Sequence, residues 1–167
     1  IWEFGYGPTA AQLVTQLTGR GIRRVSGRVI GDASLFDGAR GGLLSNLAAD
    51  IPDFGGQLSA LTYDHGATSG ALSPGAFAAR QLTRSLRAAK VRARAATATD
   101  VTPRRARLLA VVSSPRLATL ITLMNVPSDD LFAELLTKQL GVRFYGEGTI
   151  TAGARVITHT IAGYGLH

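Results

Sequence analysis

Cysteine is absent from the 167 residues, which excludes disulfides, thiolate metal sites and cysteine nucleophiles. No run of 18 apolar residues occurs, so the sequence predicts no membrane-spanning segment in this chain. The closely spaced glycines lack the further Gly, or the Gly-Lys-Ser/Thr, that a phosphate-binding loop requires. The histidines are His65, His159 and His167, and their wide spacing does not indicate a zinc site. We interpret them as surface or core imidazoles.

Lysine is also scarce, since only Lys90 and Lys138 accompany 16 arginines. With 11 acidic residues the net charge is +7, which favours an anionic partner such as nucleic acid, an anionic cell surface or an acidic peptide. The basic residues concentrate from Arg80 to Arg107, beginning on a predicted helix face opposite an apolar stripe. Residues 78–110 contain no aromatic side chain that would stack on bases. A solvated helix face is therefore favoured over nucleic-acid binding.

The hydrophobic pattern predicts an α/β fold with most of its helix after residue 73. Thr9 and Gln12 fit a capping box, and Ser73-Pro74 is typical of a helix start, while Gly141 is expected to end a helix. The expected helices cover residues 8–19, 73–89, 114–124, 128–140 and 151–162. The expected strands cover residues 23–30, 57–63 and 108–112, with an edge strand within 91–107. A domain boundary is expected in the loop 64–75.

Residues 124–134, Met-Asn-Val-Pro-Ser-Asp-Asp-Leu-Phe-Ala-Glu, carry the most informative pattern. Structurally, Ser128 would be a helix N-cap, with Asp129 and Asp130 in the first turn, where the helix dipole favours anions. Functionally, Ser128-Asp129-Asp130 resembles the Ser-x-Asn signature of the penicillin-recognising serine enzymes.

The order of several further segments supports the functional interpretation. Together they resemble the low-molecular-mass class C penicillin-binding proteins, which are D-alanyl-D-alanine carboxypeptidases and endopeptidases of the bacterial envelope. The segments that carry this resemblance are 25–36, 57–64, 73–79, 109–117 and 124–130. Their order resembles that of the family over nearly the entire chain.

The resemblance implies part of a penicillin-binding-protein-like transpeptidase core, residues 73–167, and part of an inserted accessory domain, residues 1–72. It implies a serine-type carboxypeptidase that acts on peptidoglycan stem peptides, binds β-lactams and is exported to the periplasm or cell envelope. Ser128 and Asp130 would be the catalytic residues, with Ser128 relaying a proton toward the leaving amine. The family implies no metal or organic cofactor, and no nucleic-acid partner is expected.

Two further family motifs are missing from this sequence. No Ser-x-x-Lys occurs, because residue 87 is Arg and residue 135 is Leu, and no Lys-Thr-Gly occurs. Since the chain also begins at Ile1 without a leader, we expect an internal piece of a longer enzyme that does not turn over substrate alone. Asp130 replaces the expected Asn, and an ionised carboxylate accepts hydrogen bonds but cannot donate one to substrate.

Two alternatives remain open from the sequence. One is a non-catalytic scaffold or insert that binds cell-wall polymers. The other is a basic module that binds nucleic acid, for which the salt dependence of DNA binding is the discriminating measurement.

Overall fold

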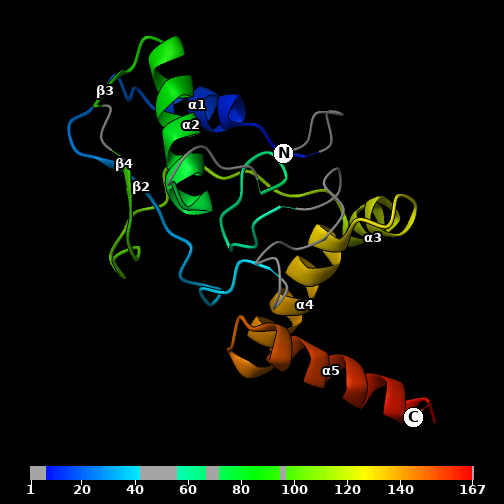
Figure 1. The fold of residues 1–167 in the computed structure, drawn as a ribbon. Coiled ribbons are helices and arrows are strands. Elements are labelled where there is room, and N and C mark those ends of the chain that lie inside the picture. The colour runs from blue at the N-terminus through cyan, green and yellow to red at the C-terminus, as the bar shows by residue number, and fades with distance from the viewer. Residues whose placement is uncertain (1–6, 42–55, 67–71, 95–96, 167) are drawn as a thin grey trace.

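The computed structural model describes residues 7–41, 56–66, 72–94 and 97–166 (Figure 1). The helices are α1 (Ala10–Gly19), α2 (Pro74–Ala88), α3 (Leu117–Asn125), α4 (Asp130–Tyr145) and α5 (Ile150–Gly163). The strands are β1 (Arg24–Val25), β2 (Val29–Gly31), β3 (Arg92–Ala93) and β4 (Thr97–Thr99). This mixture of helices and short strands confirms the α/β class and the concentration of helix after residue 73.

Helices α1 and α2 and the four strands pack together at one end of the molecule (Figure 1). The capping box is present, because Thr9 Oγ1 accepts from the Gln12 N–H and Gln12 Oε1 accepts from the Thr9 N–H. Two parallel pairs, β1 with β3 and β2 with β4, form beside α2. Val14, Leu86 and Val91 form the buried core between these elements.

The expected strand 23–30 is divided, since residues 26–28 separate β1 from β2. Each of these short strands pairs with a different partner, and the chain turns between the two pairings. Val25 and Val29 nevertheless pack on the same core, as the alternation of apolar residues predicts.

Helix α2 begins and ends through local hydrogen bonds. Ser73 Oγ accepts from the Ala76 N–H with Pro74 in the first turn, as predicted. At its end the Val91 N–H donates to Leu86 O and the Lys90 N–H donates to Arg87 O, which is a Schellman motif. Ala89, the C-cap residue of this helix, is exposed.

Helices α3, α4 and α5 form the other end of the molecule, with α5 leading away to the C-terminus (Figure 1). Helix α4 does not stop at Gly141 as expected but continues to Tyr145, and Gly146 follows it at φ +72°. Gly141 serves close packing instead, because a Cβ there would lie 2.4 Å from Glu147 O and 3.0 Å from Gly153 N. No helix in the described ranges is long and apolar enough to cross a membrane.

Two predictions of strands were wrong. Residues 57–63 form no strand, because their backbone bonds go to loops: the Leu58 N–H donates to Arg40 O, and the Gln57 N–H to Gly66 O. Residues 108–112 have no strand assignment and pair with none of the described strands, and Leu108 is 73% exposed. There the Gln16 side-chain amide acts as the neighbouring strand would, accepting from the Val111 N–H and donating to Val111 O. An apolar run alone does not supply a pairing partner.

Candidate functional site at the start of helix α4

The start of α4 is built by Asp129 rather than by Ser128. Asp129 Oδ1 accepts from the Phe132 N–H at 3.1 Å, so Asp129 is the N-cap and the expectation for Ser128 was one residue early. Ser128 lies immediately before it at φ +59°, a left-handed conformation that is unfavourable for a residue with a Cβ. The Asp129 N–H donates to Met124 O at 2.8 Å, which closes the turn between α3 and α4.

The three residues of the signature differ sharply in exposure. Ser128 and Asp130 are exposed, whereas Asp129 between them is only 1% exposed. Asp129 thus anchors the turn, and the two predicted site residues flank it at the surface.

The buried carboxylate of Asp129 contacts a histidine that is distant in sequence. His65 Nε2 lies 2.7 Å from Asp129 Oδ2, and both side chains are largely shielded from solvent. Because an ionised carboxylate only accepts, Nε2 carries the hydrogen in this contact. The His65 ring also packs edge-on against Phe132, with ring centroids 5.8 Å apart.

A strained turn presents His65 to α4. Asp64, His65 and Gly66 have φ angles of +50°, +54° and +73° in succession. Left-handed backbone at non-glycine residues costs roughly 1–2 kcal/mol each, so the surrounding contacts must hold it. The turn lies directly on Gly56, where a Cβ would lie 2.1 Å from His65 O.

An apolar cluster fixes α4 beneath this contact. Leu58 is fully buried against Leu131, and Leu135 packs on both. A small cavity of about 130 Å³ lies beside them, lined by residues of α3 and α4 together with His65 and the 114–115 segment. The segment after Gly56 therefore contributes both an apolar side chain and the imidazole to the start of α4.

Charged groups continue along α4. Burial, reinforced by the negative charge of Asp130, raises the pKa of the Glu134 carboxyl, and Lys138 offsets part of this. Lys138 is fully buried, forms an ion pair with Asp37 and donates to Ala39 O at 3.0 Å. Its ammonium also lies 5.9 Å from the ring centroid of Phe36.

Residues 54–167 match the model of the D-Ala-D-Ala carboxypeptidase 3 (S13) family, which covers about two thirds of the chain. The chain belongs to the D-Ala-D-Ala carboxypeptidase 3 (S13) family. It is accordingly assigned to a family of peptidases, as the resemblance of its motifs predicts. No curated protein matches the chain.

The part that matches the carboxypeptidase family contains every group at the start of α4. Ser128 and Asp130, the two predicted site residues, lie on either side of the N-cap Asp129 and are both exposed. Sequence reasoning missed His65 and Asp129 as a pair, because 64 residues separate them and nothing local links them. The sequence feature that could have indicated a tight turn at His65 is the Asp64-His65-Gly66 tripeptide, because these residue types tolerate left-handed backbone. Within the described ranges, no group of three or more metal-ligating side chains is found.

Proposed function

We propose that this chain is an internal part of a serine-type D-Ala-D-Ala carboxypeptidase that acts on peptidoglycan stem peptides. The observation that carries the proposal is the start of α4, where Ser128 and Asp130 flank the buried Asp129–His65 contact within the family match. An exposed hydroxyl beside a helix start that is anchored by a buried carboxylate is suited to contact a substrate.

The proposed reaction is acyl transfer. A serine outside this chain attacks the carbonyl between the two terminal D-alanines, and its bond to that carbonyl forms as the peptide C–N bond breaks. Ser128 relays a proton to the leaving amine, and water then hydrolyses the acyl-enzyme. The Ser-x-x-Lys and Lys-Thr-Gly motifs of this reaction belong to parts of the enzyme outside these 167 residues, so the chain alone is inactive.

The replacement of Asn by Asp130 affects this mechanism. An ionised carboxylate offers no donor to the substrate, and it favours the charged form of a nearby catalytic lysine, which makes that lysine a weaker base. The intact enzyme should therefore be acylated more slowly than one with Asn at this position.

The proposal extends to domains and location. Residues 1–72 would be part of an accessory domain and residues 73–167 part of the catalytic domain of an exported, β-lactam-binding enzyme of the cell envelope. Helix α2, just beyond this boundary, packs on α1 and β2 of the first part, so the two parts are in direct contact.

Labelling with a fluorescent penicillin tests the proposal. This chain alone should give no stoichiometric adduct by mass spectrometry, and an adduct on any of its serines would show that the nucleophile is misplaced. In the intact enzyme, Asp130→Asn should raise the acylation rate by up to about 10²-fold, because one hydrogen bond to developing charge contributes about 2–4 kcal/mol. An unchanged rate with a small loss of stability would instead mean that Asp130 only favours the helix start.

A further inference from the structure

The end of α2 and the strands β1 and β3 line an open groove of about 540 Å³. Of the nine described residues that line it, five are cationic, namely Arg24, Arg87, Lys90, Arg92 and Arg94, and none is acidic. We propose that this cationic groove binds a base-free phosphodiester polymer, the class of anionic chain in which phosphates are joined through polyols.

The strand register places two of these cations side by side. Arg24 pairs with Arg92 in the parallel ladder, and both residues are exposed. Like charges directly opposite each other destabilise a sheet. An anion bound between Arg24 and Arg92 would reduce the repulsion between their guanidinium groups. Arg94 is likewise exposed two residues beyond Arg92, which is about 6.6 Å along an extended chain and comparable with one phosphodiester repeat.

Among the described residues, no acidic side chain forms an ion pair with a cation of the groove. The two ion pairs found among the described residues are His65–Asp129 and Lys138–Asp37, and neither involves a groove cation. Arg87 is oriented by its own backbone contact, since its Nε donates to Ala93 O at 2.9 Å. The guanidinium groups thus present positive charge to an external ligand, and arginine forks match phosphate in two-point contacts.

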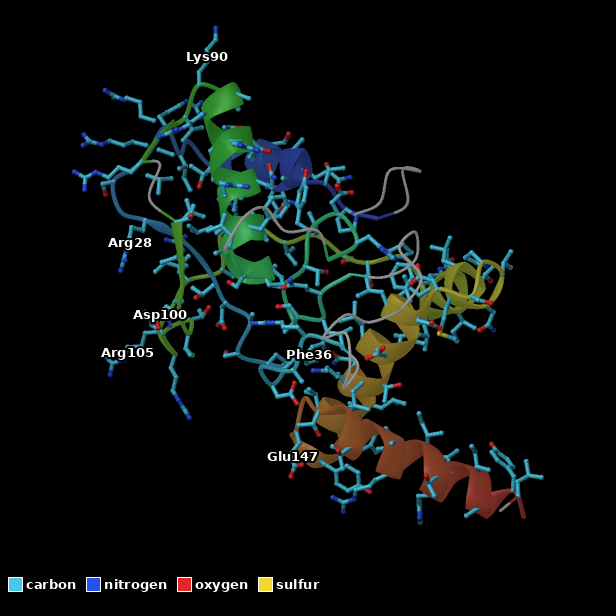
Figure 2. The ribbon with its side chains drawn as sticks, viewed as in Figure 1. Arg28, Phe36, Lys90, Asp100, Arg105 and Glu147 are labelled. Carbon is cyan, nitrogen blue, oxygen red and sulfur yellow. The ribbon has the colours of Figure 1, made fainter. Side chains whose placement is uncertain are left out.

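Lys90 occupies a position where glycine would be more stable. It follows the C-cap of α2 at φ +60°, in the Schellman motif that glycine usually fills. Its side chain projects outward from the end of α2 (Figure 2). A lysine thus occupies a strained backbone position beside a groove that is already rich in arginine. We expect its positive charge to contribute to binding of the anionic ligand.

The composition of the groove selects among polyanions. Residues 78–110 have no aromatic side chain on which bases would stack. None of the large exposed apolar side chains found in the described residues lines the groove, so it lacks an anchor for acyl chains. Phosphates on a flexible backbone without bases or lipid tails are the ligand that these residues fit.

The test measures binding of a fluorescent poly(glycerol phosphate) oligomer to this chain by anisotropy over a range of salt concentrations. The double variant Arg24→Gln/Arg92→Gln should weaken binding at least about tenfold at low salt and reduce the slope of log K against log salt by about 1.4. The matched control Arg104→Gln/Arg105→Gln removes the same charge from an exposed turn outside the groove. At physiological salt the control should change the affinity by less than about twofold, because charges farther than about 8 Å from the ligand are largely screened.

Lys90→Gly separates binding from stability. It should weaken binding while the melting temperature rises or stays constant, because glycine adopts the left-handed conformation without strain. Undiminished affinity in both groove variants would overturn the proposal. An equal loss of affinity in the control pair would also overturn it, because the net charge of the chain would then account for binding.

Two further ligands, matched in phosphate concentration, distinguish the source of the phosphate. Tighter binding to phosphatidylglycerol vesicles would overturn the polymer in favour of a membrane, and tighter binding to oligothymidylate would overturn it in favour of nucleic acid. Weaker binding to both supports the polymer. The groove lies on other elements than the start of α4, so either result leaves the carboxypeptidase proposal unaffected.

Discussion

At the scale of single residues, Asp129 joins two functions in one carboxylate. One oxygen caps α4 by accepting from the Phe132 N–H, and the other accepts from His65 Nε2. The side chain is fully buried, so each contact is made away from competing water. Ser128 and Asp130 adjoin this anchored residue on either side.

Replacing Asp129 should therefore destabilise the protein more than replacing its neighbour. Asp129→Ala removes an N-cap and the acceptor of a buried imidazole, which together cost about 2–4 kcal/mol in the free energy of unfolding. Asp130→Ala removes an exposed first-turn anion and should cost about 0.3–1 kcal/mol. Urea titration of both variants measures the difference. Equal costs would contradict the anchoring role of Asp129.

Asp32 provides a pH-dependent contribution to stability. Hydrogen bonds from Ser34 and Thr102 hold the pKa of this carboxyl well below its usual range, with the Thr102 N–H at 2.7 Å. Because the folded-state pKa is lowered, the stabilisation is complete above the unfolded pKa of about 3.9 and is lost as the pH falls further.

Melting temperatures of the wild type and Asp32→Ala should thus differ at neutral pH and converge as the pH falls well below about 4. The difference is small, because Asp32 is only partly buried and its hydrogen bonds with Ser34 and Thr102 are exposed to solvent screening. Ser34→Ala, which removes one of the donors, should show an intermediate difference. A gap that widens toward acid pH would contradict this assignment.

At the scale of elements, the contact between α4 and α5 depends on two glycines. A Cβ on Gly153 would lie 1.9 Å from Thr137 O, and one on Gly141 would lie 3.0 Å from Gly153 N. The backbones of the two helices approach each other closely because neither position has a side chain. Gly141 consequently lies within α4, despite the usual tendency of glycine to end helices.

Gly153→Ala should separate α4 from α5 and cost about 1–3 kcal/mol, as overpacking typically does. Gly163→Ala is the matched control, since it lies in the same helix and, among the described residues, no atom beyond its own stretch of helix lies within 4 Å of its Cβ position. That variant should leave stability unchanged or slightly improved. Thermal unfolding followed by circular dichroism compares them, and similar melting temperatures would show that the contact adapts without strain.

At the scale of the whole molecule, the loop 32–41 joins the two ends. Asp37 of this loop forms an ion pair with the buried Lys138 of α4, and its N–H donates to Gly148 O at 3.0 Å. Figure 1 shows the loop between the α2 end and the α4–α5 end of the molecule. The position of α4 relative to the rest therefore rests on a polar contact as well as on Leu58 and Leu131.

Removing the two partners of this ion pair should have unequal effects. Asp37→Ala leaves a buried ammonium without its counterion and should cost about 3–5 kcal/mol. Lys138→Met replaces the buried charge by an apolar chain and leaves a carboxylate that is 35% exposed, so its cost should be clearly smaller. Chemical denaturation of both variants measures the asymmetry, and a larger cost for Lys138→Met would contradict it.

The sequence by itself determined the α/β class, the position of most helix after residue 73 and the helix starts at Thr9 and Ser73. These features depend on hydrogen bonds and apolar spacing within a turn or two, so local residue types specify them. Only the tertiary structure decided that 57–63 and 108–112 lack a strand partner, and that His65 contacts Asp129. Such contacts join segments far apart in the chain, and the path of the backbone between them decides which groups meet.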